Sequence, residues 1–275
     1  MIAFRTIGGT GNRMFIYATA WALKKQGINT CISSFSFLHY FKIPLYEKIL
    51  NLLKWYYIRL VRKLQHVSNY NFKNGWENHS PQLIAVEGNA IVTGYFQGLH
   101  YFENIQDEIK QKFEVKKKYR NKFEDYITPY KKQKIIAVQI RRTDYQKFND
   151  SDLMGPDLTL PLTYYNNNNL MEQKRKEDSY QFIIMGDDKQ YLHDQFDGLP
   201  DVIISDNNEI IDLQILIHAD VCIISPSSFG WWGAWLNEKT DKIVYVPEYY
   251  LGFKVNREYP IGIIPAAWNK VKIQT

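Results

Sequence analysis

The chain has 275 residues, of which 45% are hydrophobic and 15% aromatic, and its formal net charge is +5. This apolar content is enough for a packed core and excludes an intrinsically disordered chain. The modest positive charge suits a small molecule that carries phosphates or an anionic membrane surface, and no motif supports a nucleic-acid partner.

The N-terminal segments predict the start of a parallel α/β sheet. A short β-type segment, Ile2–Thr6, leads into the glycine-rich turn Gly8–Asn12. Apolar residues then recur at helical spacing as far as Gly27, which suits a helix C-cap. Residues 29–33 are the next predicted strand. Strand, glycine turn, helix and strand in this order are typical of such a sheet.

A basic amphipathic helix is predicted over Leu45–Gln65, where Leu and Ile are crowded among lysines and arginines. Two interpretations remain open. The helix docks on an anionic membrane surface, especially through the basic segment Lys48–Lys63, or it packs within its domain while its cations border the solvent.

The region after this helix is less regular. Residues 66–82 are polar and rich in Asn, so we predict a loop there. Beyond it we expect two strands, at 84–86 and 91–94, and a helix at 99–113.

A charged stretch, 116–134, contains Pro129 and is the predicted linker or domain boundary. We therefore expect one domain over residues 1–132 and a second over residues 133–275.

The second half alternates apolar strands with helices. The continuous apolar run 135–140 is typical of a parallel strand that is buried on both faces. Its repetition along the chain predicts a doubly wound α/β fold. The other predicted strands are 181–185, 202–204, 221–224 and 243–246, and the predicted helices are 162–176, 189–196, 209–219 and 229–237.

Ligands of doubly wound sheets bind beyond the carboxyl ends of the strands, so the polar residues at these ends are the candidates. The run 135–140 leads into Arg141, Arg142 and Asp144. A guanidinium fork matches a phosphate group through two hydrogen bonds. Asp144 is a candidate proton acceptor. The alternative for these residues is a structural Arg–Asp ion pair.

Asp187 and Asp188 follow the strand 181–185. They could bind a ribose, a base edge or a metal ion. Enzymes that hold a metal ion with a short Asp pair often have one residue between the two Asp, and these two are adjacent, so we predict no metal site. As an alternative or additional role, one of them caps the helix 189–196.

Two further segments have the features of phosphate sites. Ser227 and Ser228 follow the strand 221–224, and one or the other is predicted to cap a helix whose free N–H groups bind an anion. Gly9 and Gly11 would allow a sugar phosphate to approach the backbone closely.

In this order, the segments together resemble the α-1,2-fucosyltransferase family over about residues 2–247. Gly8–Ala18 resembles the family's G-G-x-G-N-Q-M-F-Q-Y-A motif, Gln139–Tyr145 its H-x-R-R-x-D-Y run, Met185–Asp188 its S-x-D-D strand end, Ser225–Leu236 its S-N-S-S-F-S-W-W-G-A-W-L run, and Gly94–Gln97 a further family segment.

The resemblance implies a GT-B-like α/β fold of two Rossmann-like domains that face each other across a cleft. Domain 1–132 would then bind the acceptor and domain 133–275 the nucleotide sugar. The implied reaction transfers L-fucose from GDP-fucose to the 2-hydroxyl of a galactose, terminal in an oligosaccharide or surface polysaccharide, with inversion and without a metal or other cofactor. The catalytic candidates are Arg141, Asp144 and Asn12, and the donor-binding candidates are Gly9, Gly11, Gln139, Arg141, Arg142, Asp187, Asp188, Ser227, Ser228 and Phe229.

The sequence departs from the family pattern at several positions. Gln139 replaces a His that lies near the nucleotide in related enzymes, and Arg13, Pro226 and Gly230 replace Gln, Asn and Ser. Two alternatives therefore stay open: a transferase for another nucleotide sugar, or a non-catalytic nucleotide- or glycan-binding protein of the same fold. The retention of both Arg141 and Arg142 argues against the second.

The two cysteines, Cys31 and Cys222, lie in apolar segments and form neither a disulfide framework nor a zinc pattern. They indicate a reducing compartment. No apolar signal segment precedes Arg5, and no stretch approaches about 20 apolar residues. We expect a cytoplasmic protein, with peripheral contact to the inner face of the membrane as an open interpretation.

Overall fold

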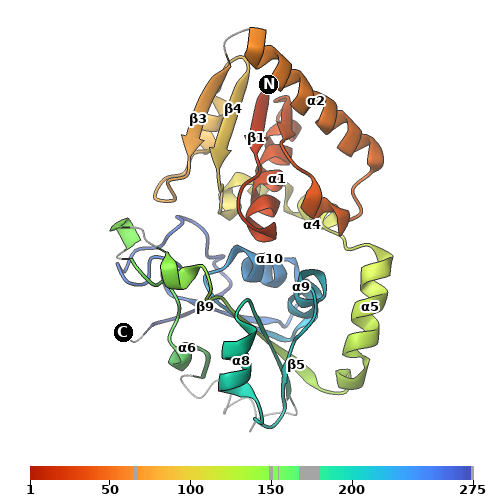
Figure 1. The fold of residues 1–275 in the computed structure, drawn as a ribbon, viewed down its shortest axis with the longest axis vertical. Coiled ribbons are helices and arrows are strands. Elements are labelled where there is room, and N and C mark those ends of the chain that lie inside the picture. Colours follow the sequence, from red (N-terminus) through yellow and green to blue (C-terminus); the bar gives the residue numbers. More distant parts are fainter. Residues whose placement is uncertain (65–66, 149–150, 154, 167–179, 274–275) are drawn as a thin grey trace. The chain divides into compact units, whose positions relative to one another are not determined.

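The computed structural model consists of two compact units, each built around its own parallel sheet (Figure 1). Unit 1 comprises residues 1–116 and 260–263, and unit 2 comprises residues 117–259 and 264–275. This architecture confirms the predicted α/β fold class. The structure describes residues 1–64, 67–148, 151–153, 155–166 and 180–273.

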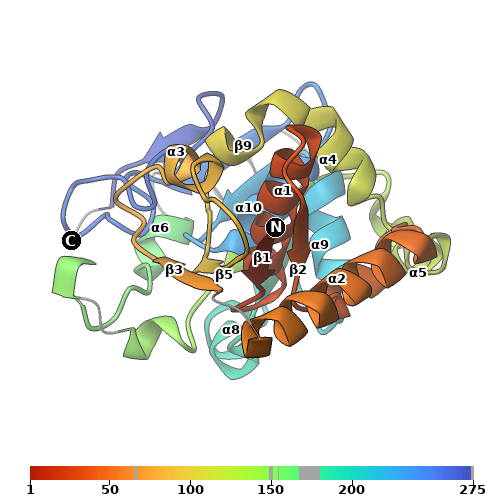
Figure 2. The same cartoon turned by 90° about the horizontal axis from the view of Figure 1, so that it is seen from above.

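The sheet of unit 1 has four parallel strands in the order β2-β1-β4-β3. Helix α1 (Thr10–Lys25) covers one face of this sheet, and α2 (Leu45–Leu64) covers the other (Figure 2). Beneath α2, Ile58 and Val61 pack in one cluster with Ala3, Cys31 and Ile91 of the sheet. The strands are β1 (Ile2–Arg5), β2 (Thr30–Ile32), β3 (Ser68–Phe72) and β4 (Ala90–Gly94).

Glycines define both ends of α1, as the sequence predicted. Gly8 has a φ of +72°, and a Cβ at this position would lie 2.3 Å from Nδ2 of Asn12, so only glycine fits the turn before the helix. The helix ends at Lys25, and Gly27 has a φ of +87°.

Two predictions for the middle of unit 1 are wrong. The predicted loop 66–82 contains the edge strand β3 and the short helix α3 (Ser80–Ile84), and the predicted strand 84–86 begins at the last residue of α3. The side chains of β3 are mostly exposed, so its sequence lacks the apolar residues of an ordinary strand. The predicted helix 99–113 is divided into η2 (Leu99–Tyr101), η3 (Glu103–Ile105) and α4 (Gln106–Lys112). A further short helix of unit 1 is η1 (Ser36–His39).

The boundary between the two units falls after Lys116, inside the stretch 116–134 that was predicted as a linker or domain boundary. This stretch is not an unstructured linker, because it contains helix α5 (Lys117–Ile127) and the turn η4 (Thr128–Tyr130). Phe123 of α5 stacks on His218 with 4.9 Å between ring centroids. The carbonyl of Tyr119 accepts a hydrogen bond of 3.1 Å from Nε2 of Gln214. These contacts join α5 to unit 2, whereas the sequence assigned it to the first domain.

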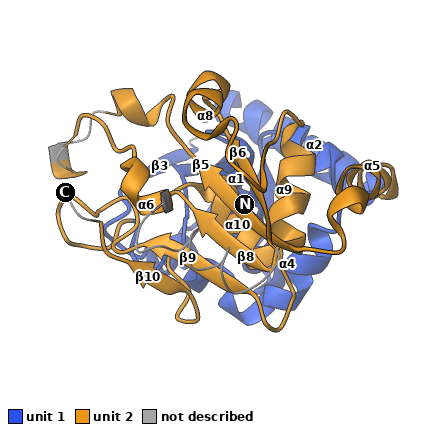
Figure 3. Cartoon of the chain, turned by 90° about the horizontal axis from the view of Figure 1, so that it is seen from below, with its two compact units in different colours: residues 1–116, 260–263 blue, residues 117–259, 264–275 orange. Residues whose placement is uncertain are grey.

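The sheet of unit 2 has six parallel strands in the order β10-β9-β8-β5-β6-β7 (Figure 3). Residues 135–140 of β5 are all buried, as the apolar run predicted. The C-terminal strand β10 pairs with β9 and was not predicted, because it is only three residues long and mostly exposed. The strands are β5 (Lys134–Ile140), β6 (Tyr180–Gly186), β7 (Val202–Ile204), β8 (Val221–Ile224), β9 (Ile243–Pro247) and β10 (Asn269–Val271).

The strand order reverses between β5 and β8. The chain runs from β5 outward to β6 and β7, and then returns to β8 on the other side of β5. The segments that leave β5 and β8 therefore diverge, and this point is where such sheets bind ligands. Besides α5 and η4, the described residues of this unit form the helices α6 (Leu162–Asn166), α8 (Lys189–Phe196), α9 (Glu209–His218) and α10 (Ser228–Leu236) and the turns η5 (Tyr145–Lys147) and η6 (Ser151–Leu153).

Helix α10 is buried and packs closely on α9. Its three tryptophans, Trp231, Trp232 and Trp235, are all buried and contact one another. A Cβ at Gly233 would lie 2.4 Å from Cβ of Leu216, so this glycine allows the two helices to approach. The predicted helix 162–176 is present as α6 up to residue 166, and 167–176 lie outside the described residues.

A buried carboxyl group in α9 makes the stability of unit 2 sensitive to pH. Asp212 is 8% exposed, and its Oδ1 accepts a hydrogen bond of 2.5 Å from Oγ of Ser205. Burial raises the pKa of Asp212 from 3.8 to about 6, although this hydrogen bond and the charge of Lys189 act in the opposite direction. The fold therefore favours the protonated carboxyl group.

We predict that Asp212→Asn stabilises the protein more at neutral pH than in acid. Because the pKa is raised, the contribution of Asp212 to stability is full below pH 3.8 and is lost as the pH rises through about 6. A difference of about two pKa units corresponds to about 3 kcal/mol. Urea unfolding of the variant and the wild type between about pH 4 and about pH 8 measures this difference. Asp125→Asn, an exposed carboxyl on α5, is the control, and a pH-independent difference for Asp212→Asn would contradict the prediction.

Candidate functional site

The carboxyl ends of β5 and β8 are joined by Ser225. Its backbone N–H and its hydroxyl both donate to the carbonyl of Gln139, each at 2.9 Å, and its Oγ accepts from the backbone N–H of Arg141 at 2.8 Å. The hydroxyl of Tyr165 lies 2.6 Å from the same Oγ. Ser225 is fully buried. It therefore fixes the position at which Arg141 leaves the sheet.

Asp187, at the end of β6, organises the segment that follows β5. Its two oxygens accept from the backbone N–H groups of Arg142 and Thr143, at 2.9 and 3.2 Å, and from the hydroxyl of Thr143 at 2.5 Å. Its Oδ2 also lies 3.0 Å from a terminal nitrogen of Arg141. These contacts indicate that Asp187 orders the loop rather than presenting an open carboxylate to a ligand.

Arg141 is held between two carboxylates. Its Nε lies 2.8 Å from Oδ1 of Asp144, in addition to its ion pair with Asp187. Burial by itself would lower the pKa of Arg141, but the hydrogen bond to Asp144 and the charge of Asp187 outweigh it, and the pKa is raised. A guanidinium has five N–H groups, so two ion pairs leave donors for an anion. The structural ion pair and a phosphate clamp are therefore compatible.

Arg142 is directed toward α8 instead. Its guanidinium carbon lies 3.6 Å from the centre of the Tyr191 ring, and its Nε lies 3.7 Å from Oδ2 of Asp188. Among the described residues, this buried Nε has no hydrogen-bond partner. Asp188 accepts from the backbone N–H of Tyr191 at 3.1 Å, which confirms the predicted cap of α8.

The first turn of α10 lies next to the segment after β5, because the hydroxyl of Tyr145 donates to the carbonyl of Pro226 at 2.6 Å. Ser227 is the N-cap residue, but its side chain makes no capping hydrogen bond, contrary to the prediction. Ser228 and Phe229 are partly exposed. The N–H groups of this turn remain available to an anion, since helix N-termini leave them without intrahelical partners.

Gln139 and Gly230 are in contact, and both depart from the family pattern. Gln139 is buried, and its Oε1 has no hydrogen-bond partner among the described residues. A Cβ at Gly230 would lie 2.6 Å from this oxygen. The Gln side chain therefore occupies space that the family's Ser at position 230 would fill, and the two departures are linked sterically.

In unit 1, the glycine turn and the segment after β4 meet at Asn12. Oδ1 of Asn12 accepts a hydrogen bond of 2.6 Å from Nε2 of Gln97. A Cβ at Gly9 would meet no atom within 4 Å, so this position offers room for a ligand, whereas Gly11 is buried in the first turn of α1. Arg13 is bound within the unit, to the carbonyl of Gly8 and to Oγ of Ser36, each at 2.9 Å.

The described residues contain no group of three or more His, Cys, Asp or Glu side chains that could hold a metal ion. Sequence reasoning did not assign Ser225, Thr143, Tyr191 or Gln97 to the site. Ser225, Thr143 and Gln97 lie inside the motifs that carry the resemblance, so the motifs pointed to them. For Tyr191 no signal was available, because its position over Arg142 depends on the fold.

A parallel α/β unit that presents paired arginines and a helix N-terminus at its switch point is suited to a nucleotide-sugar transferase. Residues 3–252 match the model of glycosyl transferase family 11, and the chain belongs to this family. The predicted family resemblance is thereby confirmed.

Two curated relatives come from Escherichia coli. The chain is 22% identical to an alpha-1,2-colitosyltransferase over 268 residues, which cover 90% of this chain and 91% of that one. It is 28% identical to the O-antigen biosynthesis glycosyltransferase WbnK over 175 residues, which cover 60% of this chain and only 56% of that relative.

Solved fucosyltransferases share the fold. The NodZ alpha-1,6-fucosyltransferase, in a crystal soaked with GDP-fucose, matches with a TM-score of 0.54 at 14% identity, over 86% of this chain and 92% of NodZ. The structure of NodZ from Bradyrhizobium matches with a TM-score of 0.51 at 15% identity, over 85% of this chain and 92% of NodZ. At this identity, the likeness confirms the fold and does not by itself assign a substrate.

We predict that Arg141→Ala greatly weakens the binding of GDP. The variant loses charged hydrogen bonds and leaves Asp187 without its cation, and each such loss is worth roughly 1.5–3 kcal/mol. Arg141→Lys should recover only part of the affinity, since the planar fork is lost. Titration calorimetry with GDP provides the measurement, and Arg120→Ala, an exposed arginine on α5, is the control. Wild-type affinity in Arg141→Ala would show that another group binds the diphosphate.

Proposed function

We propose that this protein transfers L-fucose from GDP-fucose to the 2-hydroxyl of a galactose in an oligosaccharide or surface polysaccharide, with inversion and without a metal ion. The observation that carries the proposal is the placement of Arg141. It leaves the central strand at the switch point of unit 2, held by Asp144 and Asp187, beside the open first turn of α10.

This placement suits the charge that develops in the reaction. The bond between the sugar's anomeric carbon and the β-phosphate breaks, and the departing GDP gains negative charge. Arg141 and the N–H groups of α10 would stabilise that charge, which is the main electrostatic requirement of the step. Arg142 offers a second cation, and its buried Nε is a donor without a hydrogen-bond partner among the described residues.

The acceptor hydroxyl must lose a proton as it attacks. Asp144 pairs with Arg141 through one oxygen and is more than half exposed, so its second oxygen remains a candidate acceptor for that proton. An oxocarbenium-like transition state would lessen the need for a strong base. Asn12, oriented by Gln97, is the candidate for positioning a substrate on unit 1.

The relatives support the linkage and the kind of acceptor. One is an alpha-1,2-colitosyltransferase and another acts in O-antigen biosynthesis. The colitosyltransferase also suggests a second candidate function for this protein, in which the donor sugar is colitose rather than fucose. The linked departures at Gln139 and Gly230 favour testing it, since they change the packing beside the proposed donor site. The paired arginines favour catalysis over a merely binding protein.

A donor screen tests the proposal. We expect transfer from GDP-fucose to galactose-terminated oligosaccharides, detected by mass spectrometry, with an α-1,2 linkage assigned by NMR and full activity in excess EDTA. GDP-colitose is the parallel donor, and preferential transfer from it would select the second candidate. Binding of GDP without turnover of any donor would favour the non-catalytic alternative. Loss of activity in EDTA, restored by Mn²⁺ or Mg²⁺, would contradict metal independence.

The proposed function extends to the lipid surface on which such acceptors are built. Only Ile58 and Val61 of α2 are buried, and the outward side of this helix is apolar and flanked by cations. This arrangement matches a helix that lies in a membrane interface. None of the helices among the described residues could cross a bilayer. The exposed apolar residues of α2 are Leu45, Tyr46, Ile49, Leu50, Leu52, Leu53, Tyr56, Tyr57, Leu60 and Leu64.

We predict that the protein co-sediments with anionic vesicles and less well with neutral ones. Leu53 and Leu60 are each about 60% exposed, so changing both to Gln should release the protein without unfolding it. Lys48→Gln with Lys63→Gln should weaken binding in a salt-dependent way. Leu199→Gln, an exposed apolar residue of unit 2, is the control. Equal recovery in the supernatant with every lipid would leave α2 a structural element.

A further inference from the structure

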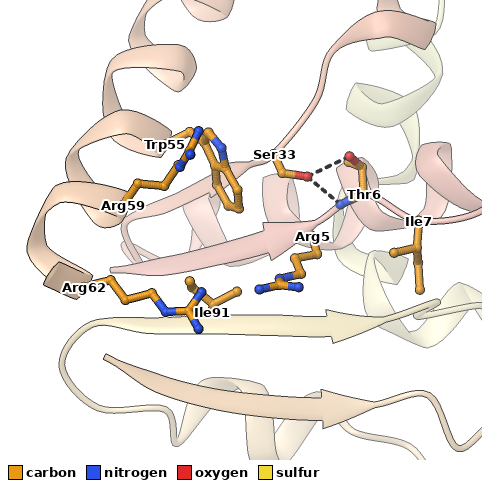
Figure 4. Close-up of a pocket in the computed structure, with 8 residues that line it drawn as sticks. All are labelled: Arg5, Thr6, Ile7, Ser33, Trp55, Arg59, Arg62 and Ile91. Carbon is orange, nitrogen blue, oxygen red and sulfur yellow. Dashed lines mark hydrogen bonds between the residues drawn. The ribbon is translucent and has the colours of Figure 1, made fainter. Parts of the chain in front are cut away.

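A cavity of about 400 Å³ lies in unit 1, and its lining includes Thr6 and Ile7 but neither the following glycine turn nor Asn12 (Figure 4). It is formed where the carboxyl end of β1 meets one flank of α2. Arg5 enters it from β1, and Arg59 and Arg62 enter it from α2. The volume is within the usual range for sites that bind small ligands.

The cavity concentrates positive charge. Among the described residues, no carboxylate lines it, and Arg5, Arg59 and Arg62 form no ion pair or hydrogen bond through their side chains. All three arginines are exposed, so water screens their mutual repulsion, but an anion bound between them would interact favourably with all three charges at once. The arrangement differs from that of Arg141, which is already held by two carboxylates.

Neutral groups complete the lining. Oγ of Ser33 accepts from the backbone N–H of Thr6 at 2.9 Å and lies 2.8 Å from its hydroxyl, so the pair is fixed at the cavity. Trp55 packs partly against the core cluster beneath α2 and provides an apolar wall. Arginine forks with nearby hydroxyls match the three or more oxygens of a phosphate better than the two oxygens of a carboxylate.

The location of the cavity indicates where its ligand comes from. Arg59, Arg62 and Trp55 lie on the same helix whose outward side carries the exposed apolar residues. If that side enters a membrane interface, the same helix would bring the arginines of the cavity close to the phosphate groups of the lipids.

We infer that this cavity is an anion site that binds a phosphate or diphosphate ester at the lipid surface. The inference rests on the proposed function, since the same chemistry belongs to a phospholipid headgroup and to a phosphate that links an acceptor glycan to a lipid carrier. In both cases the site would hold unit 1 beside the lipid-bound end of the acceptor.

Calorimetric titration with inorganic pyrophosphate tests the site directly. GDP is kept at saturation, so that the donor site of unit 2 is occupied. Arg59→Gln with Arg62→Gln should lower the pyrophosphate affinity at least about tenfold, and Arg5→Gln should lower it independently. Lys48→Gln with Lys63→Gln removes the same charge from the same helix outside the cavity and should leave the affinity unchanged. Equal pyrophosphate affinity in the wild type and both arginine variants would overturn the inference.

Further measurements distinguish a phospholipid headgroup from a lipid-linked acceptor as the ligand, and they test this site independently of the proposed function. If pyrophosphate displaces the wild type from vesicles that contain phosphatidic acid, the site binds a lipid headgroup. If it does not, and the arginine variant raises KM for a glycan diphosphate acceptor but not for the free glycan, the site binds the acceptor. The arginine variants should bind GDP as the wild type does. A donor screen without any transfer would contradict the proposed function but not the pyrophosphate titration. Each proposal can therefore be refuted independently of the other.

Discussion

The carboxylate of Asp187 is the interaction on which the candidate site depends. One side chain at the end of β6 binds two backbone N–H groups, a hydroxyl and a guanidinium of the segment that leaves β5. That segment carries both arginines and follows the last residue of β5. The contacts with Asp187 fix its conformation. Hydrogen bonds to a charged group are among the stronger ones in proteins, so the loop is organised before a ligand arrives. Preorganised charge is what a departing diphosphate requires.

Much of this arrangement could be predicted from the sequence because parallel strands place their carboxyl ends at one edge. Apolar runs identified β5, β6 and β8, and the polar residues after each run then had to be neighbours. The roles within the cluster could not be predicted in the same way. Asp187 and Asp188 are adjacent and look equivalent, yet one binds the loop and the other caps α8. Only the distances in the folded unit separate them.

The errors have a common physical origin. Strand β3 and helix α5 border their units, so their sequences are polar or charged and lack the apolar periodicity that identifies buried elements. Such elements are held by a few contacts, for example Phe123 on His218, that no local pattern encodes. Helix α2 shows the opposite case. Its periodicity predicted the helix correctly, but the larger apolar side faces outward, and the sequence could not show which side packs on the sheet.

The outward orientation of the larger apolar side of α2 also determines where the arginines of this helix lie. A helix whose apolar side covered the sheet would direct its arginines to open solvent, where water and salt would screen them. Here the small apolar strip of Ile58 and Val61 packs inward, and Arg59 and Arg62, although exposed, lie on the flank beside β1, where they line one cavity together with Arg5. One helix thus combines an outward apolar side with a cationic cavity. In the proposed docking of α2, charge and apolar surface would act together where a low-dielectric phase meets phosphate groups, as at a membrane interface.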